Sequence, residues 1–125
     1  TVQRGFDCAM RLFNGPLVQP EAVVCADDAI AFGVMVAFDA LGIRVPEDVL
    51  VVGYHDSAIA RTTMPRLTSV RAPFERIVSE CLRLLASGPA GGAAETTDAS
   101  GGNVRAPRVM LAPQLIVRDS SVFRR

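Results

Sequence analysis

The chain has 125 residues, 50% of them apolar, which is enough to bury the core of about one domain. Its 13 basic and 13 acidic side chains cancel and form no block of like charge, which excludes an electrostatic surface for DNA or an anionic membrane within this chain. The longest apolar run is interrupted well before it would cross a bilayer, so we expect no membrane partner.

The first predicted element is an amphipathic helix over residues 2–13. Its apolar residues recur at steps of three and four, and "NGP" at 14–16 supplies a helix stop. After Pro20, the continuously apolar run "AVVCA" is typical of a parallel strand that is covered on both faces.

Two aspartates, Asp27 and Asp28, follow that strand and precede a second helix. Either carboxylate can accept the free amide hydrogens of the first turn. For Asp28, which directly precedes the apolar helix, we expect helix capping or a hydrogen bond to a loop. The helix over 29–41 ends at Gly42, which can adopt the left-handed conformation of a C-cap. A second buried strand, "VLVVGY", comes next, so the order of elements predicts an α/β fold with parallel strands.

The helix over 29–41 is apolar on nearly every side, unlike a surface helix, which keeps a polar face. We expect the sheet to cover one side and a partner subunit to cover the other. Enclosure by the chain itself is an open alternative. The apolar residues are Ile30, Phe32, Val34, Met35, Val36 and Phe38.

Beyond the second strand, "SAIARTTM" predicts a short helical turn, and "MPRLTSVRAPF" is typical of an extended crossing segment between two prolines. A clear amphipathic helix follows over 73–87. The Gly-, Ala-, Ser- and Thr-rich stretch 88–107 predicts a flexible loop without an assignable function. A final strand lies within 108–121.

The reactive side chains gather where the two strands end: Asp27 and Asp28 after the first, His55 and Asp56 after the second. Ligands bind at the carboxyl ends of strands in open parallel sheets, so we expect the two pairs to converge on one rim. Successive side chains alternate in direction, so one member of each pair would face a cleft. Helix capping or loop bonding is the alternative role for the other.

An enzyme is not expected. His55 beside Asp56 resembles a general base, but no nucleophile motif accompanies it. One histidine and scattered thiols do not give a metal site, no phosphate loop is present, and no cofactor is predicted. The cysteines, Cys8, Cys25 and Cys81, are odd in number and far apart, as expected of reduced thiols in a cytoplasmic protein.

Several motifs resemble the effector-binding domain of LacI/GalR-type bacterial transcription repressors. They are the aspartate that opens an "A-x-G" helix (Asp28, Ala31, Gly33), "GIRVPEDV" at 42–49, "VVGY" at 51–54, "MPRLTSV" at 64–70 and "LAPQLIVRDSS" at 111–121. Their order and spacing match the family over almost the whole chain.

The resemblance implies a partial two-lobe domain like that of periplasmic sugar-binding proteins, with residues 1–125 forming an effector-binding and dimerisation part. Residues 1–70 and 108–121 would form the C-terminal lobe, and the helix within 71–87 would pack on an N-terminal lobe outside this chain. A helix-turn-helix domain, also outside it, would bind operator DNA. The family binds a small effector, here a sugar, sugar derivative or nucleobase. The alternative is a sugar-binding protein of a transporter, which shares the lobe architecture.

The resemblance also implies site residues. Asp27 occupies a position where relatives often bind the ligand. His55 stands where relatives have an effector-binding aspartate, in the motif "GYDD" or "GFDD"; here the motif is "GYHD". An imidazole can donate hydrogen bonds, so we expect an effector with an acceptor or acidic group; alternatively, Asp56 takes over the contact through a local bulge, or the pocket has drifted. The implied homodimer interface involves the helix after the aspartate and the turn after the second strand: Ile30, Val34, Phe38 and Ile59.

Overall fold

The computed structural model describes residues 1–15, 19–87, 95–97, 103–105 and 108–123, and it divides the chain into two compact units. Unit 1 comprises Thr1–Arg71 with Gln114–Arg125, and unit 2 comprises Ala72–Pro113. None of the helices in the described parts is long and apolar enough to cross a membrane.

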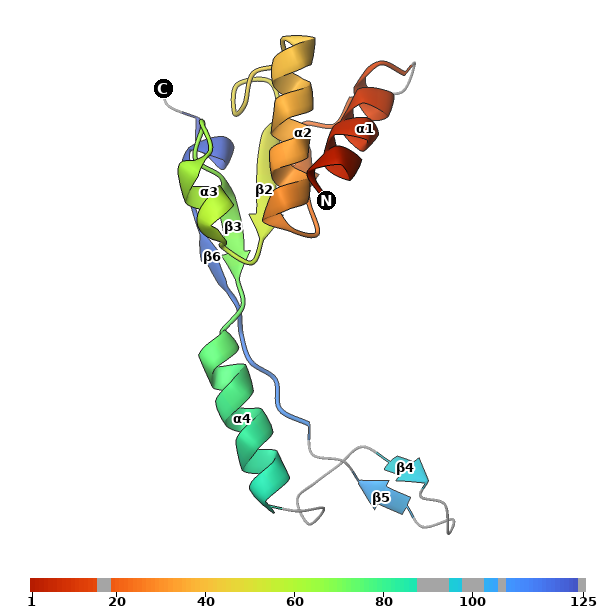
Figure 1. The fold of residues 1–125 in the computed structure, drawn as a ribbon, viewed down its shortest axis with the longest axis vertical. Coiled ribbons are helices and arrows are strands. Elements are labelled where there is room, and N and C mark those ends of the chain that lie inside the picture. The colour runs from red at the N-terminus through yellow and green to blue at the C-terminus, as the bar shows by residue number, and fades with distance from the viewer. Residues whose placement is uncertain (16–18, 88–94, 98–102, 106–107, 124–125) are drawn as a thin grey trace. The chain divides into compact units, whose positions relative to one another are not determined.

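Unit 1 is built on a four-stranded sheet in the order β1-β2-β3-β6 (Figure 1). Its strands are β1 (Ala22–Val24), β2 (Leu50–Tyr54), β3 (Thr68–Arg71) and β6 (Gln114–Ile116). The first three are parallel, and β6 runs antiparallel to β3. The predicted α/β fold with a mostly parallel sheet is therefore confirmed. The burial predicted for the first strand is wrong, because β1 lies at the sheet edge and Val24 is 78% exposed.

Two long helices complete the core. Helix α1 (Val2–Phe13) has the predicted bounds, and α2 (Asp28–Leu41) ends at Gly42, whose φ of 71° is the predicted left-handed C-cap. Of the two aspartates that could cap this helix, Asp27 is the N-cap, because its Oδ1 accepts the Ile30 amide hydrogen at 2.8 Å, whereas Asp28 is the first residue of the helix.

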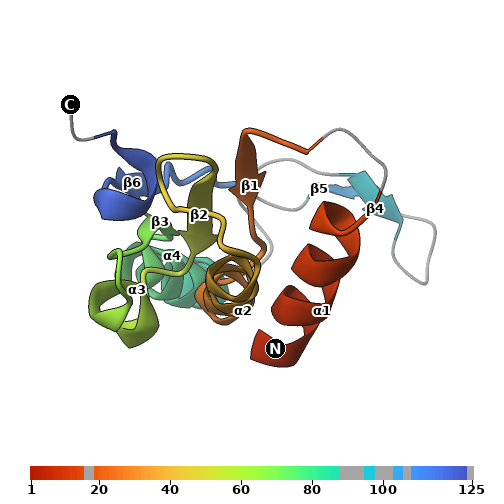
Figure 2. The ribbon, with the colours of Figure 1, turned by 90° about the horizontal axis from the view of Figure 1, so that it is seen from above.

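The two helices pack side by side, as Figures 1 and 2 show. Glycines make this close approach possible, because a Cβ at Gly5 would lie 2.1 Å from the Ile30 carbonyl oxygen and one at Gly33 would lie 1.9 Å from that of Val2. The rings of Phe13 and Phe38 meet edge to face, with centroids 4.6 Å apart. Helix α1 thus covers one side of α2.

The apolar surface of α2 is consequently narrower than the sequence indicates. Val34 and Phe38 are buried in the core of their own chain, so the prediction that they contact a partner is wrong. The exposed large apolar residues of α2 are Phe32 and Val36 instead, at 37% and 41%. Own-chain enclosure, the open alternative, therefore accounts for most of this helix.

Short elements close unit 1: α3 (Ala58–Thr62) lies between β2 and β3, and the 3-10 turn η1 (Asp119–Ser121) follows β6. Unit 2 contains α4 (Phe74–Ser87) and the antiparallel pair β4 (Glu95–Thr97) and β5 (Asn103–Arg105).

This hairpin corrects the prediction that 88–107 is only a loop; residues 88–94, 98–102 and 106–107 lie outside the described residues. Residues 108–113 belong to unit 2 rather than to the lobe predicted for them. The packing of α4 on a further lobe stays a prediction.

Candidate functional site

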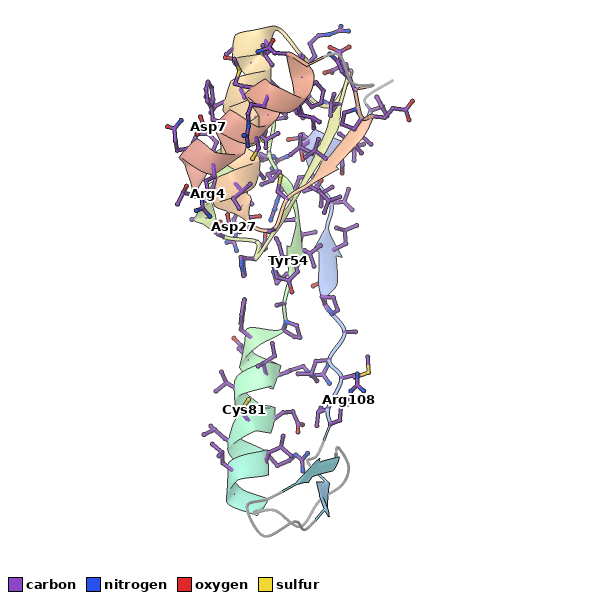
Figure 3. The ribbon with its side chains drawn as sticks, turned by 90° about the vertical axis from the view of Figure 1, so that its right-hand side faces the viewer. Arg4, Asp7, Asp27, Tyr54, Cys81 and Arg108 are labelled. Carbon is purple, nitrogen blue, oxygen red and sulfur yellow. The ribbon has the colours of Figure 1, made fainter. Side chains whose placement is uncertain are left out.

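The carboxyl ends of β1 and β2 meet at one rim of unit 1, as predicted. Figure 3 shows Asp27 at the start of α2 and Tyr54 at the end of β2, at the same end of the sheet. A cavity of about 280 Å³ opens here. Its lining residues are Asp27, Asp28, Ala29, Tyr54, His55, Ser57 and Ile59.

A larger hollow, of about 380 Å³, lies at the amino ends of β2 and β3. Val45, Pro46, Met64 and Pro65 make it largely apolar, and its lining residues Arg66 and Asp119 are paired with each other at 3.0 Å. The cavity at the rim is also lined mainly by apolar surface, but it lies at the carboxyl ends of the parallel strands, where ligands bind in open parallel sheets, so we treat it as the candidate site.

Asp28 is the buried centre of this rim. Its side chain is 2% exposed, Oδ2 accepts the Ser57 amide hydrogen at 2.7 Å, and Oδ1 accepts from Ser69 Oγ at 2.6 Å. Gly53 leaves room for the carboxylate, because a Cβ there would lie 2.3 Å from Asp28 Oδ1. Asp28 therefore ties the start of α2 to the loop after β2 and to β3.

His55 is exposed at the rim and has an unusual backbone. Its φ is 98° and that of Asp56 is 51°, a region that costs a non-glycine residue roughly 1–2 kcal/mol. The His55 amide donates to the Val70 carbonyl at 2.8 Å, and its ring meets the Tyr54 ring edge to face, with centroids 4.9 Å apart. The loop thus presents the imidazole in a defined place beside the cavity.

Asp56 points away from that cavity. Its carboxylate is fully buried and accepts hydrogen bonds from Arg71 and Arg118, with Arg61 at 3.5 Å. Burial alone would raise its pKa, but the hydrogen bonds and charges of Arg118 and Arg71 outweigh burial and lower it. The predicted effector contact of Asp56 is wrong in this structure, because its carboxylate has no exposed surface.

Sequence reasoning did not identify Arg71, Arg118 or Ser69 as part of this site. Their partners lie far along the chain: Ser69 Oγ bonds Asp28, 41 positions away, and Arg118 bonds Asp56, 62 positions away. An arginine at the end of a strand carries no local signal for such a contact. Ser69 gives no signal either, because β3 reads TSVR and is polar at its other positions except Val70.

The comparison with known families decides what this fold is. Residues 3–121 match the sequence pattern of the periplasmic binding protein-like domain. The chain belongs to this family. The match includes both sides of the rim and all four strands of the unit 1 sheet.

Curated relatives of this periplasmic binding protein-like chain are transcription regulators. The probable HTH-type transcriptional repressor ExuR of Bacillus subtilis is 40% identical over 76 residues, 61% of this chain and 22% of its own length. The HTH-type transcriptional repressor PurR of Haemophilus influenzae is 29% identical over 116 residues, 93% of this chain and 32% of its own. The chain thus spans about a third or less of these relatives.

Solved structures agree with this relationship. A complex of the transcriptional regulator CelR with cellobiose is 36% identical with a TM-score of 0.72, covering 97% of this chain and 34% of its own. A LacI-family sugar-binding regulator from Escherichia coli, complexed with phosphate, is 30% identical with a TM-score of 0.76, covering 98% and 40%. The resemblance to LacI-type effector domains is therefore confirmed.

Proposed function

We propose that this chain is the effector-sensing and dimerisation part of a LacI-type transcription regulator. The observation that carries the proposal is the rim cavity between Asp27 and His55 in a fold whose relatives are transcription regulators, one of them solved with cellobiose. An effector that prefers one arrangement of the two lobes would change operator affinity only through its differential affinity for the two arrangements. DNA would be bound by a domain outside this chain.

The rim residues suggest what kind of effector binds. Helix capping occupies one oxygen of the half-buried Asp27 carboxylate, and the other can accept a hydrogen bond from an effector hydroxyl. The His55 imidazole can donate to an acceptor or an acidic group, which a carboxylate in its place would repel. We therefore propose a sugar, a sugar acid or a nucleobase that presents such a group toward His55.

Calorimetric titration with sugars, sugar acids and nucleobases tests this proposal. For the compound that binds, His55→Ala should weaken the affinity by at least about tenfold, or 1.4 kcal/mol. The matched control is Glu47→Ala, which alters the hollow at the amino ends of β2 and β3 and should leave the affinity unchanged. A change below about twofold for His55→Ala, with a loss for Glu47→Ala, places the effector elsewhere.

We propose that the homodimer forms through the apolar surface left on α2 and the turn before β3. Phe32, Val36 and Met64 are exposed there at 37%, 41% and 96%, and they line one shallow hollow of about 250 Å³. Ile30 and Ile59 are half-buried and stay candidate contacts.

Val36→Glu places a charge in this surface and should convert the dimer into a monomer, as measured by sedimentation equilibrium. The matched control is Val24→Glu at the exposed edge strand, which should not change the mass. If Val36→Glu stays dimeric while Val24→Glu dissociates, the interface lies along β1.

The transport-protein alternative receives less support, because the relatives named above are transcription regulators. For the same reason we propose a cytoplasmic location and a binding function without a chemical step.

A further inference from the structure

The loop after β2 adopts a conformation that its own residues do not favour. His55 and Asp56 both have positive φ, and neither is glycine. Such a backbone persists when the surrounding structure fixes it. Asp56 provides two anchors: its amide donates to Ser69 Oγ at 2.9 Å, and its buried carboxylate is bound by arginines.

The two main arginine partners lie on the segments that join the two units. Arg71 is the last residue of β3 and of the first segment of unit 1, and the next residue, Ala72, begins unit 2. Arg118 lies two positions after β6, on the segment that returns from unit 2 at Gln114.

Each arginine takes a different oxygen of the same carboxylate. Arg71 Nε donates to Asp56 Oδ2 at 2.8 Å, and Arg118 donates to Oδ1. Arg118 is also fixed to the start of β3 and to the residue before it, because its amide donates to Thr68 Oγ1 at 2.8 Å and its Nη1 donates to the Leu67 carbonyl at 2.8 Å. One carboxylate therefore joins the His55 loop to both connecting segments.

We infer that Asp56 is a positioning residue, which holds the loop that presents His55 and couples that loop to the two segments leading to unit 2. It acts through His55, not by touching the effector, so the functional consequence rests on the proposed effector contact of His55. Because Arg71 and Arg118 share the carboxylate, a shift of either segment would change the hydrogen bonds that hold the loop of His55.

Amide hydrogen exchange of the ligand-free 125-residue chain tests this inference. In Asp56→Asn, which keeps the side-chain volume, the amides of residues 55–57 should exchange at least about tenfold faster, beyond any change in the α2 amides. The resonance of the His55 ring is a second readout, since this is the only histidine of the chain, and it should move. The matched control, Asp48→Asn, removes an exposed Arg44–Asp48 pair and should change neither readout.

Equal acceleration of the loop and of α2 would overturn the inference, because Asp56 would then stabilise the unit as a whole. If Asp56→Asn does not fold, the same exchange measurement is made on Arg71→Gln. This variant removes one arginine partner of the carboxylate, and the Arg71 side chain is 46% exposed. The amides of residues 55–57 should again be accelerated more than those of α2. No effector is needed, so this test and the calorimetric test of the proposed function can fail independently.

Discussion

Gly33→Ala should separate α1 from α2 and remove much of the stability of the chain. The new Cβ would lie 1.9 Å from the Val2 carbonyl oxygen and 2.9 Å from the Phe6 amide nitrogen, so the backbone of α1 must move. Overpacking a core typically costs 1–3 kcal/mol; we expect about 3 kcal/mol or more here, because backbone atoms rather than a flexible side chain are in the way. Urea unfolding followed by circular dichroism measures the loss.

Gly42→Ala is the control, because it adds the same methyl group where nothing lies within 4 Å. Its cost should be limited to the left-handed backbone of Gly42, roughly 1–2 kcal/mol. If Gly42→Ala destabilises the chain more than Gly33→Ala, the close helix contact is not a determinant of stability.

Asp28→Ala should destabilise the chain by about 3–5 kcal/mol, because it leaves two buried donors without their acceptor and each such loss costs roughly 1–3 kcal/mol, more when the partner is charged. The donors are the Ser57 amide and Ser69 Oγ. Ser69 Oγ also accepts the Asp56 amide hydrogen, so the disturbance should reach the loop of His55. Chemical denaturation reports the cost, and exchange of the Ser57 amide reports the local opening.

The neighbouring aspartate provides a matched comparison. Asp27→Ala removes only the cap of α2, in which Oδ1 accepts the Ile30 amide hydrogen, and should cost about 1 kcal/mol. A larger loss for Asp27→Ala than for Asp28→Ala would contradict the assigned roles of the two carboxylates.

The two aspartates also show where sequence reasoning stops. The bounds of α1, the C-cap at Gly42 and the parallel order of the strands follow from local periodicity and turn residues, and they were predictable. Which aspartate caps α2 was not, because both can cap it locally. Ser57 and Ser69, which lie 29 and 41 positions beyond Asp28, decide the matter by binding its carboxylate.

The candidate site was predictable in place but not in composition. Strand topology brings Asp27 and His55 to one rim, as parallel strands require. The burial of Asp56 depends on arginines that arrive from the ends of β3 and β6, and no short-range pattern indicates such a partnership. The exposed β1 and the enclosed α2 likewise depend on which elements neighbour them, since an apolar run alone does not distinguish an edge position from a central one.

The central claim is that the effector binds at the rim formed by Asp27 and His55. A two-dimensional NMR titration of the chain with the compound identified by calorimetry tests it most directly. We expect the perturbed amides to cluster in residues 27–30 and 53–57, together with the His55 ring resonance. Perturbations centred on residues 45–47 and 64–66, with the His55 ring unchanged, would contradict the claim and place the effector in the hollow at the amino ends of β2 and β3.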